Sequence, residues 1–212
     1  MFKNLFGKKN SPNVEKFIKS MEMDYAKYHN GDGYDLNILK ELNAEELQQV
    51  EAVLIPRKDK DWRDVTALAA VNTSTALEAV KSCLESPNLE VRIFAAKFLK
   101  EKNIIDRVEE VLLKTLPIVK VGGGLVQALA LAKENPTEKV KQKLIWCALH
   151  GPDVTRTHCA AMALFLYGKA ESEFDNNQKI IFSFNPPDKA KRLEAFPELC
   201  QIIGVNPNEF MN

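Results

Sequence analysis

This sequence of 212 residues lacks the charge excess that marks a general nucleic-acid-binding protein. Its 29 basic residues are balanced by 29 acidic ones, so the formal net charge at pH 7 is zero. A protein that binds nucleic acid without sequence preference needs a basic face to neutralise phosphates. Nucleic acid is therefore not the expected partner, although a local basic patch stays open.

Cysteine is scarce and carries no recognisable pattern. The four residues, Cys83, Cys147, Cys159 and Cys200, form no C-x-x-C pair and no spacing typical of a disulfide framework. Each falls on the apolar face of an expected helix, where cysteine acts as a small hydrophobic residue. Such usage is typical of a reducing compartment, so we expect a cytoplasmic protein.

Long apolar runs and strand-like alternation are also missing. Residues 1–10 contain no apolar stretch of the length found in signal peptides. The longest apolar tract, residues 121–132, is interrupted by Gln127 and is shorter than the ~20 residues that a membrane-spanning helix needs. No segment sustains the alternation of a half-buried strand. We therefore expect an all-α protein with no membrane partner.

Helical periodicity is present instead, and it is clearest in residues 62–102. In residues 75–85 apolar side chains recur at three- and four-residue steps, as on one face of a helix. Residues 86–88, Ser-Pro-Asn, end this helix and cap the next, in which residues 91–99 form a second apolar stripe. Neither helix can bury its stripe alone, so neighbouring helices must stack on both sides.

The same reasoning predicts helices along the rest of the chain. We expect them over residues 12–30, 35–42, 44–54, 104–116, 125–133, 138–150, 154–168 and 187–203. Asn43 and Glu46 match a capping box before the third of these. Tyr25 and Leu193 fall on the apolar stripes of the first and last helix, and Pro197 should kink or split the last one. The pattern lapses from about residue 169, where we expect a less regular C-terminal cap on a single domain of residues 1–212.

Residues 84–99, LESPNLEVRIFAAKFL, resemble the second half of a HEAT-type repeat, with a proline-containing turn, a Val-Arg pair, small residues and a leucine. Residues 149–168 match this pattern again at an offset of 65, which leaves room for two repeats of roughly 33 residues. The fit is imperfect, because Arg92 falls on Thr157 and the nearest arginine is Arg156. The resemblance implies a HEAT-like α-solenoid of antiparallel helix pairs, in which Arg92 pairs with polar groups of the adjacent repeat.

Residues that could carry chemistry do not form a recognisable site. Cys147, His150, His158 and Cys159 gather around an expected turn between helices. Adjacent residues such as His158 and Cys159 point in different directions on a helix, and zinc-ligand pairs usually have about two to five residues between them. We interpret the four as core cysteines and polar histidines, and we expect no catalytic residue, no metal and no cofactor. The glycines at residues 122–124 match neither phosphate-loop pattern and are expected to form a turn.

Acidic residues are concentrated in residues 22–51, which hold eight acidic side chains against two lysines, a net of −6. A charge run is most often a solvated face. The alternative is a docking surface for a basic partner, since charge steers association. The candidate contact residues are Asp24, Asp32, Asp35, Glu41 and Glu45, with Trp62 as a partly exposed aromatic anchor and Arg63 beside it.

Residues 34–46, 61–80 and 158–175 together look like a group of small bacterial HEAT-repeat proteins. Some small cytoplasmic HEAT-like proteins serve as immunity proteins in toxin systems, including contact-dependent growth inhibition. The resemblance implies a non-enzymatic protein whose partner is another protein, such as a basic nuclease toxin domain. The alternatives are a HEAT-like nucleic-acid-processing enzyme, such as a DNA glycosylase, and a general scaffold.

Overall fold

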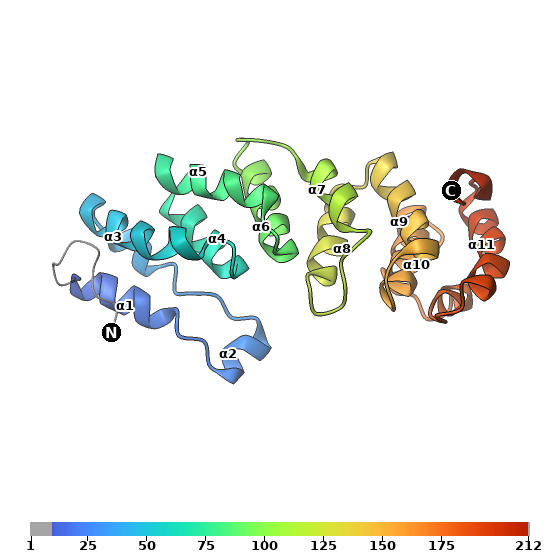
Figure 1. Cartoon of the computed structure of the whole chain (residues 1–212), viewed down its shortest axis with the longest axis horizontal. Helices are drawn as coiled ribbons and strands as arrows, with labels where there is room; N and C mark the ends of the chain where they lie inside the picture. Colours follow the sequence, from blue (N-terminus) through green and yellow to red (C-terminus); the bar gives the residue numbers. More distant parts are fainter. Residues whose placement is uncertain (1–9, 212) are drawn as a thin grey trace. The chain divides into compact units, whose positions relative to one another are not determined.

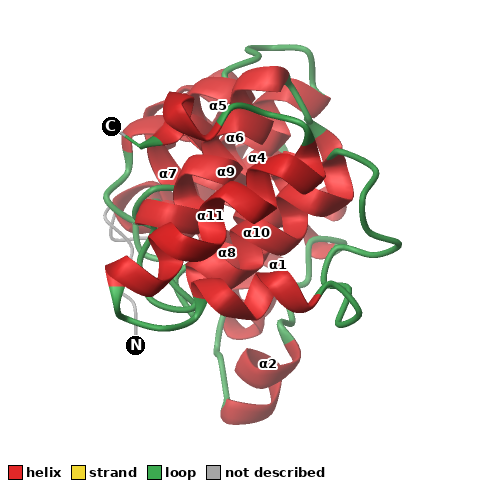
Figure 2. Ribbon diagram, turned by 90° about the vertical axis from the view of Figure 1, so that its right-hand side faces the viewer, coloured by secondary structure: helices red, strands yellow, loops and turns green. Residues whose placement is uncertain are grey.

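The structure is a computed structural model that describes residues 10–211. Every regular element in that range is a helix, which confirms the all-α prediction there (Figures 1 and 2). The expectation for residues 1–9 lies outside the described part. The chain divides into two compact units, Met1–Ile104 and Ile105–Asn212, which are considered in turn. The single domain expected for residues 1–212 stays a prediction.

The described part of the first unit consists of short helices joined by tight turns. Its α-helices are α1 (Pro12–Ser20), α2 (Tyr25–Asn30), α3 (Ala44–Leu54), α4 (Trp62–Val71), α5 (Ser74–Ser82) and α6 (Leu89–Glu101). Three 3-10 helices lie between them: η1 (Ile38–Glu41), η2 (Ile55–Arg57) and η3 (Cys83–Glu85). The three helices expected in residues 62–102 are all present, and so is the capping box of Asn43 and Glu46.

The single helix expected over residues 12–30 is wrong. The chain forms α1 and α2 with a break after Ser20, whose hydroxyl donates to the carbonyl of Phe17. Asp24 then starts a new helix, because its carboxylate accepts the backbone N–H of Lys27 at 2.8 Å. As a consequence Tyr25, expected on the buried stripe, is 82% exposed.

Small residues lie where the helices of the first unit meet. Ala95 and Ala96 on α6 are buried, as are Ala67 and Ala69 on α4, and the two helices pack against each other. Small side chains permit a close approach of the helix backbones, so larger residues at these positions would overfill the contact. Ala95 and Ala96 are the small residues of the HEAT-type pattern in residues 84–99, and both are buried.

The second unit contains α7 (Val108–Thr115), α8 (Leu125–Glu134), α9 (Glu138–His150), α10 (Thr155–Leu166), η4 (Lys179–Phe184), α11 (Lys189–Ile203) and η5 (Pro207–Phe210). Helices α9 and α10 pack together through a turn that begins at Gly151. Helix α10 is buried along most of its length, because η4 and α11 pack against it as well. The expected C-terminal cap therefore contains two 3-10 helices, η4 and η5, and one long α-helix.

The last helix differs from its prediction at two positions. Helix α11 is not split at Pro197, which lies on its exposed side. Leu193 is expected to face the core but is 37% exposed, and Arg192 takes the buried position instead. The guanidinium of Arg192 donates to the carbonyls of Leu149, Pro186 and Pro187, which satisfies its donors without a carboxylate.

Candidate functional site

The most exposed aromatic side chains of the described chain lie on α2. Tyr25 is 82% exposed and Tyr28 is 69% exposed, and no residue of this helix is buried. Figures 1 and 2 show α2 standing away from the other helices of its unit. Tyrosine is among the residues enriched in protein interfaces, and here two of them are exposed on one short helix. We therefore take this helix as the candidate functional site.

Helix α2 is short but is closed at both ends. Asp24 caps its first turn, and Gly31 ends it in the left-handed conformation, with φ of 72°. The backbone N–H of Asp32 then returns to the carbonyl of Lys27 at 2.9 Å. Glycine is favoured at this position because a side chain would be strained there. These contacts hold the two tyrosines in place although nothing covers them.

Arg63 supports this region from inside the protein. Its side chain is buried, its Nε donates to the backbone carbonyl of Asp32, and its guanidinium forms an ion pair with Asp61 at 3.3 Å. The guanidinium carbon lies 5.9 Å from the ring centre of Tyr28, within cation–π range. Sequence reasoning places Arg63 among the surface contacts. That prediction is corrected: Arg63 is buried and ties the end of α2 to α4.

The acidic segment separates into two groups. Asp24, Asp32 and Asp35 are exposed and flank α2 in the chain. Glu41 and Glu45 are also exposed but lie by the first turn of α3. This turn is held against the start of α1 by a bond from the hydroxyl of Ser11 to the carboxylate of Glu46 at 2.6 Å, whereas α2 follows the other end of α1.

Glu46 and Glu51 have structural partners and offer less charge to a ligand. The carboxylate of Glu46 completes the capping box, and the hydroxyl of Ser11 followed by the backbone of Asn43 lowers its pKa. Glu51 is buried and accepts a hydrogen bond from the hydroxyl of Thr73. The segment of residues 22–51 is therefore not one continuous acidic face, and only its exposed members could steer a basic partner.

Trp62 is half-buried at the start of α4. Its ring stacks on Phe94 with 4.6 Å between ring centres, and the guanidinium carbon of Arg63 lies 4.6 Å from its own ring centre. Together with Phe94 and Phe98 it lines a hollow of about 200 Å³. Its role as an anchor stays a prediction, although part of the ring is committed to packing inside the unit.

The cysteine and histidine residues around the α9–α10 turn point to different partners. Cys147 and Cys159 are fully buried, and a hydrogen bond to Cys147 together with burial raises the pKa of the Cys159 thiol. His150 stacks on Trp146, and its Nε2 lies 2.9 Å from the carbonyl oxygen of Phe210. Within residues 10–211 no three residues among His, Cys, Asp and Glu are grouped so that they could hold a metal ion.

No family model, no curated protein and no solved structure matches this chain. Within residues 10–211, none of the helices has the length and apolar character needed to cross a bilayer.

Sequence reasoning names the three aspartates around α2 but misses the tyrosines between them. The apolar spacing assigns Tyr25 to a buried stripe and gives Tyr28 no role. A signal is nevertheless available: Asp24 is a good N-cap residue and Gly31 a good helix terminator, so the segment between them can form a separate short helix.

Proposed function

We propose that this chain is a non-enzymatic, cytoplasmic, HEAT-like α-solenoid that binds a basic partner protein through α2. The name α2 surface is used for Tyr25 and Tyr28 with the flanking carboxylates of Asp24, Asp32 and Asp35. The observation that carries the proposal is the pair of exposed tyrosines on a helix fixed at both ends.

The chemistry of the α2 surface suits protein recognition better than catalysis. Tyrosine brings a large contact area with only two side-chain torsions to freeze, so it makes a strong anchor at low entropic cost. The three exposed carboxylates flank the anchors in the chain, and their charge would act as a rim that raises the rate of encounter with a positive surface. The four buried thiols are poor nucleophiles: burial raises the pKa of Cys83 and Cys200 to about 11.

The resemblance to small bacterial HEAT-repeat proteins extends the proposal to a specific role. We propose an immunity protein that binds a cognate toxin, and the acidic rim favours a basic nuclease domain as that toxin. An acidic inhibitor fits such a target because a nuclease needs positive charge where it holds its phosphate substrate.

The test begins with the partner. The tagged full chain is used to purify its partner from the native host, and a toxin-like reading frame next to its gene is expressed in parallel. Binding is then measured with the purified partner at two salt concentrations, together with the partner's nuclease activity. We expect affinity to fall with added salt, since exposed charges are screened over roughly 8 Å at physiological ionic strength.

Two matched variants locate the contact. The first, Tyr25→Ala with Asp32→Lys, changes the α2 surface and leaves the Asp24 cap intact. The second, Glu41→Lys with Glu45→Lys, reverses more charge but lies by the first turn of α3. We expect the first to weaken binding about tenfold or more and to slow association, because it removes an anchor and a rim charge. An equal or larger loss in the second variant, with both chains folded by circular dichroism, would show that general charge and not α2 is recognised.

A further inference from the structure

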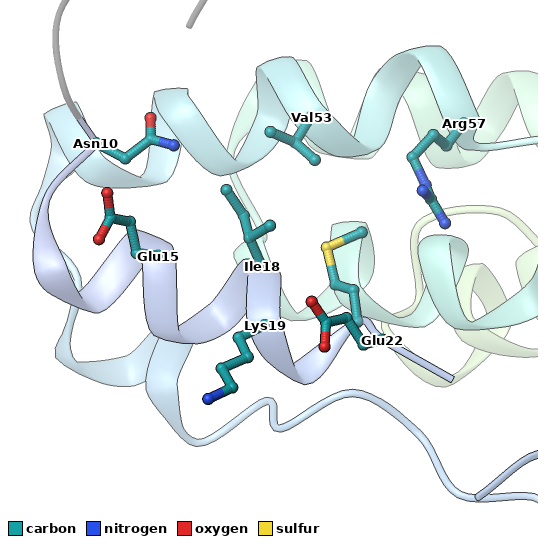
Figure 3. A pocket seen from close by; sticks show the side chains of 8 residues that line it. Asn10, Glu15, Ile18, Lys19, Glu22, Val53 and Arg57 are labelled. Atoms are coloured by element: carbon teal, nitrogen blue, oxygen red, sulfur yellow. The ribbon is translucent and has the colours of Figure 1, made fainter. Parts of the chain in front are cut away.

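A hollow of about 450 Å³ lies between α1 and α3 of the first unit, apart from the α2 surface (Figure 3). Pockets of roughly 300–1,000 Å³ are the usual size for small ligands. The side chains of Ile18 and Val53 meet across its middle. Arg57 lies at one end, whereas Asn10 and Glu15 lie at the other. Lys19, Met21 and Glu22 complete the lining.

Arg57 is fixed from the buried side. Its Nε donates to the Oδ1 of Asp64 at 3.3 Å, and the hydroxyl of Tyr34 donates to the same oxygen at 3.0 Å. Asp64 is fully buried, while the side chain of Arg57 is 35% exposed. The second carboxylate oxygen of Asp64 is buried and has no hydrogen-bond partner among the described residues. The ion pair thus ties Arg57 to the buried Asp64 at the end of the hollow.

The guanidinium keeps donors for a ligand. Arginine has five N–H donors in a planar fork that matches a carboxylate or a phosphate. The side-chain partners of Arg57 are Asp64 and Tyr34, both of which are buried. Arg57 is one of the residues that line the hollow, and its side chain is 35% exposed, so donors that do not bind Asp64 or Tyr34 are available to a ligand.

The charges of the lining favour a carboxylate over a phosphate as the ligand of Arg57. Arg57 and Lys19 are balanced by Glu15 and Glu22, and no ion pair joins them among the described residues. A phosphate with two negative charges and no apolar part would face two carboxylates and leave the aliphatic floor empty. A peptide end matches the order of the lining: a carboxylate for Arg57, apolar side chains for Ile18 and Val53, and a cationic group for Glu15 at the other end.

We propose that this hollow binds the C-terminal end of a short apolar peptide, with Arg57 as the receptor of the terminal carboxylate. Capture of a terminal carboxylate is an established mode of peptide recognition, and charge-assisted bidentate bonds from arginine are strong and directional. The inference does not depend on the α2 surface, so either can fail alone.

The test uses the tripeptide Lys-Leu-Val with a free carboxylate and the same peptide with an amidated C-terminus. Binding to the full chain is followed by NMR chemical-shift changes and titration calorimetry. We expect the acid form to bind at least about tenfold more tightly than the amide, since only the acid offers a charged acceptor. Inorganic phosphate serves as a third probe and is expected to bind more weakly than the peptide acid.

Three variants test whether the peptide binds in the hollow. Arg57→Gln should remove the difference between acid and amide. Val53→Trp should block both peptides by filling the floor while leaving the Arg57–Asp64 ion pair in place, so the proposal is tested even if Arg57→Gln fails to fold. Lys16→Gln, an exposed change on α1 that is not part of the lining, should leave binding unaltered. Equal binding of acid and amide, no shift with either at millimolar concentration, or phosphate binding more tightly than the peptide acid would overturn the proposal.

Discussion

Replacing Ala96 by leucine tests the packing of the first unit most directly. Ala96 is 1% exposed on α6, next to the fully buried Ala95, and α6 packs against α4. Leucine has nearly the helix propensity of alanine, so the substitution changes packing and hardly alters the helix itself. The added carbon atoms must displace neighbours in a close-packed contact, which costs about 1–3 kcal/mol of the free energy of unfolding.

The expected loss is large enough to measure by thermal unfolding. For a chain of this length, 1–3 kcal/mol corresponds to a fall of about 2–12 °C in Tm. The matched control is Ala70→Leu, the same change at an exposed position of α4. A surface substitution of this kind should shift stability by no more than about 0.5 kcal/mol. If the two variants melt together by circular dichroism, the contact at Ala96 is looser than the burial indicates and the reasoning fails.

Two further predictions concern the second unit. Phe196→Ala should lower the free energy of unfolding, measured with denaturant, by about 3–5 kcal/mol, because Phe196 is fully buried. Leu193→Ala should lower it by less than about 1 kcal/mol, because Leu193 is exposed. Similar losses in the two variants would mean that α11 is rotated. Hydrogen bonds from Arg107, and secondly from Lys114, lower the pKa of Glu110 to about 2. The ionised carboxylate therefore stabilises the fold fully above the unfolded-state pKa near 4.5, and this stabilisation is lost as the pH falls toward 2. Carboxyl NMR titration should show this low value, and Arg107→Gln should return it toward 4.5; an unshifted titration in the natural chain would contradict the ion pairs.

Helices bounded by strong local signals can be predicted to the residue. The sequence predicts a helix over residues 138–150, and α9 spans Glu138–His150. The hydroxyl of Thr137 accepts the N–H of Val140 at the start, and Gly151 follows the end. A side chain at Gly151 would meet the carbonyl of Cys147 at 2.5 Å, so glycine is required there by close approach of the backbone. Such boundary signals depend only on residues next to the helix, so they can be identified from the sequence.

The break between α1 and α2 shows where periodicity misleads. The apolar spacing of Phe17, Met21 and Tyr25 continues across the break, so a count of matching positions favours one helix. The hydroxyl of Ser20 and the carboxylate of Asp24 bind the backbone instead, and these bonds outweigh a weak stripe. Exposure of Tyr25 then follows from the break and not from its residue type.

Partners far apart in the chain are beyond the reach of sequence reasoning. Arg63 has the charge of a surface residue, but the carbonyl of Asp32, 31 residues away, and the carboxylate of Asp61 satisfy its donors inside the protein. In the same way Tyr34 and Asp64 meet across 30 residues. A charged residue can be buried only when such partners are supplied by the fold, and the fold must be known before they can be named.

Arg92 and Arg156 make a similar hydrogen bond, although the alignment of the two segments does not pair them. At the offset of 65, Arg92 falls on Thr157 and has no counterpart. In the structure Arg92 donates to the carbonyl of Ser86, and Arg156 donates to the carbonyl of Gly151 at 3.1 Å. Each carbonyl belongs to the turn that precedes the arginine's own helix, so a shift of one residue in sequence leaves the contact in place. Arg92 is therefore bound to its own turn, whereas Arg156 also donates to the carbonyls of Phe184, Asn185 and Pro186 and so ties its helix to the end of η4.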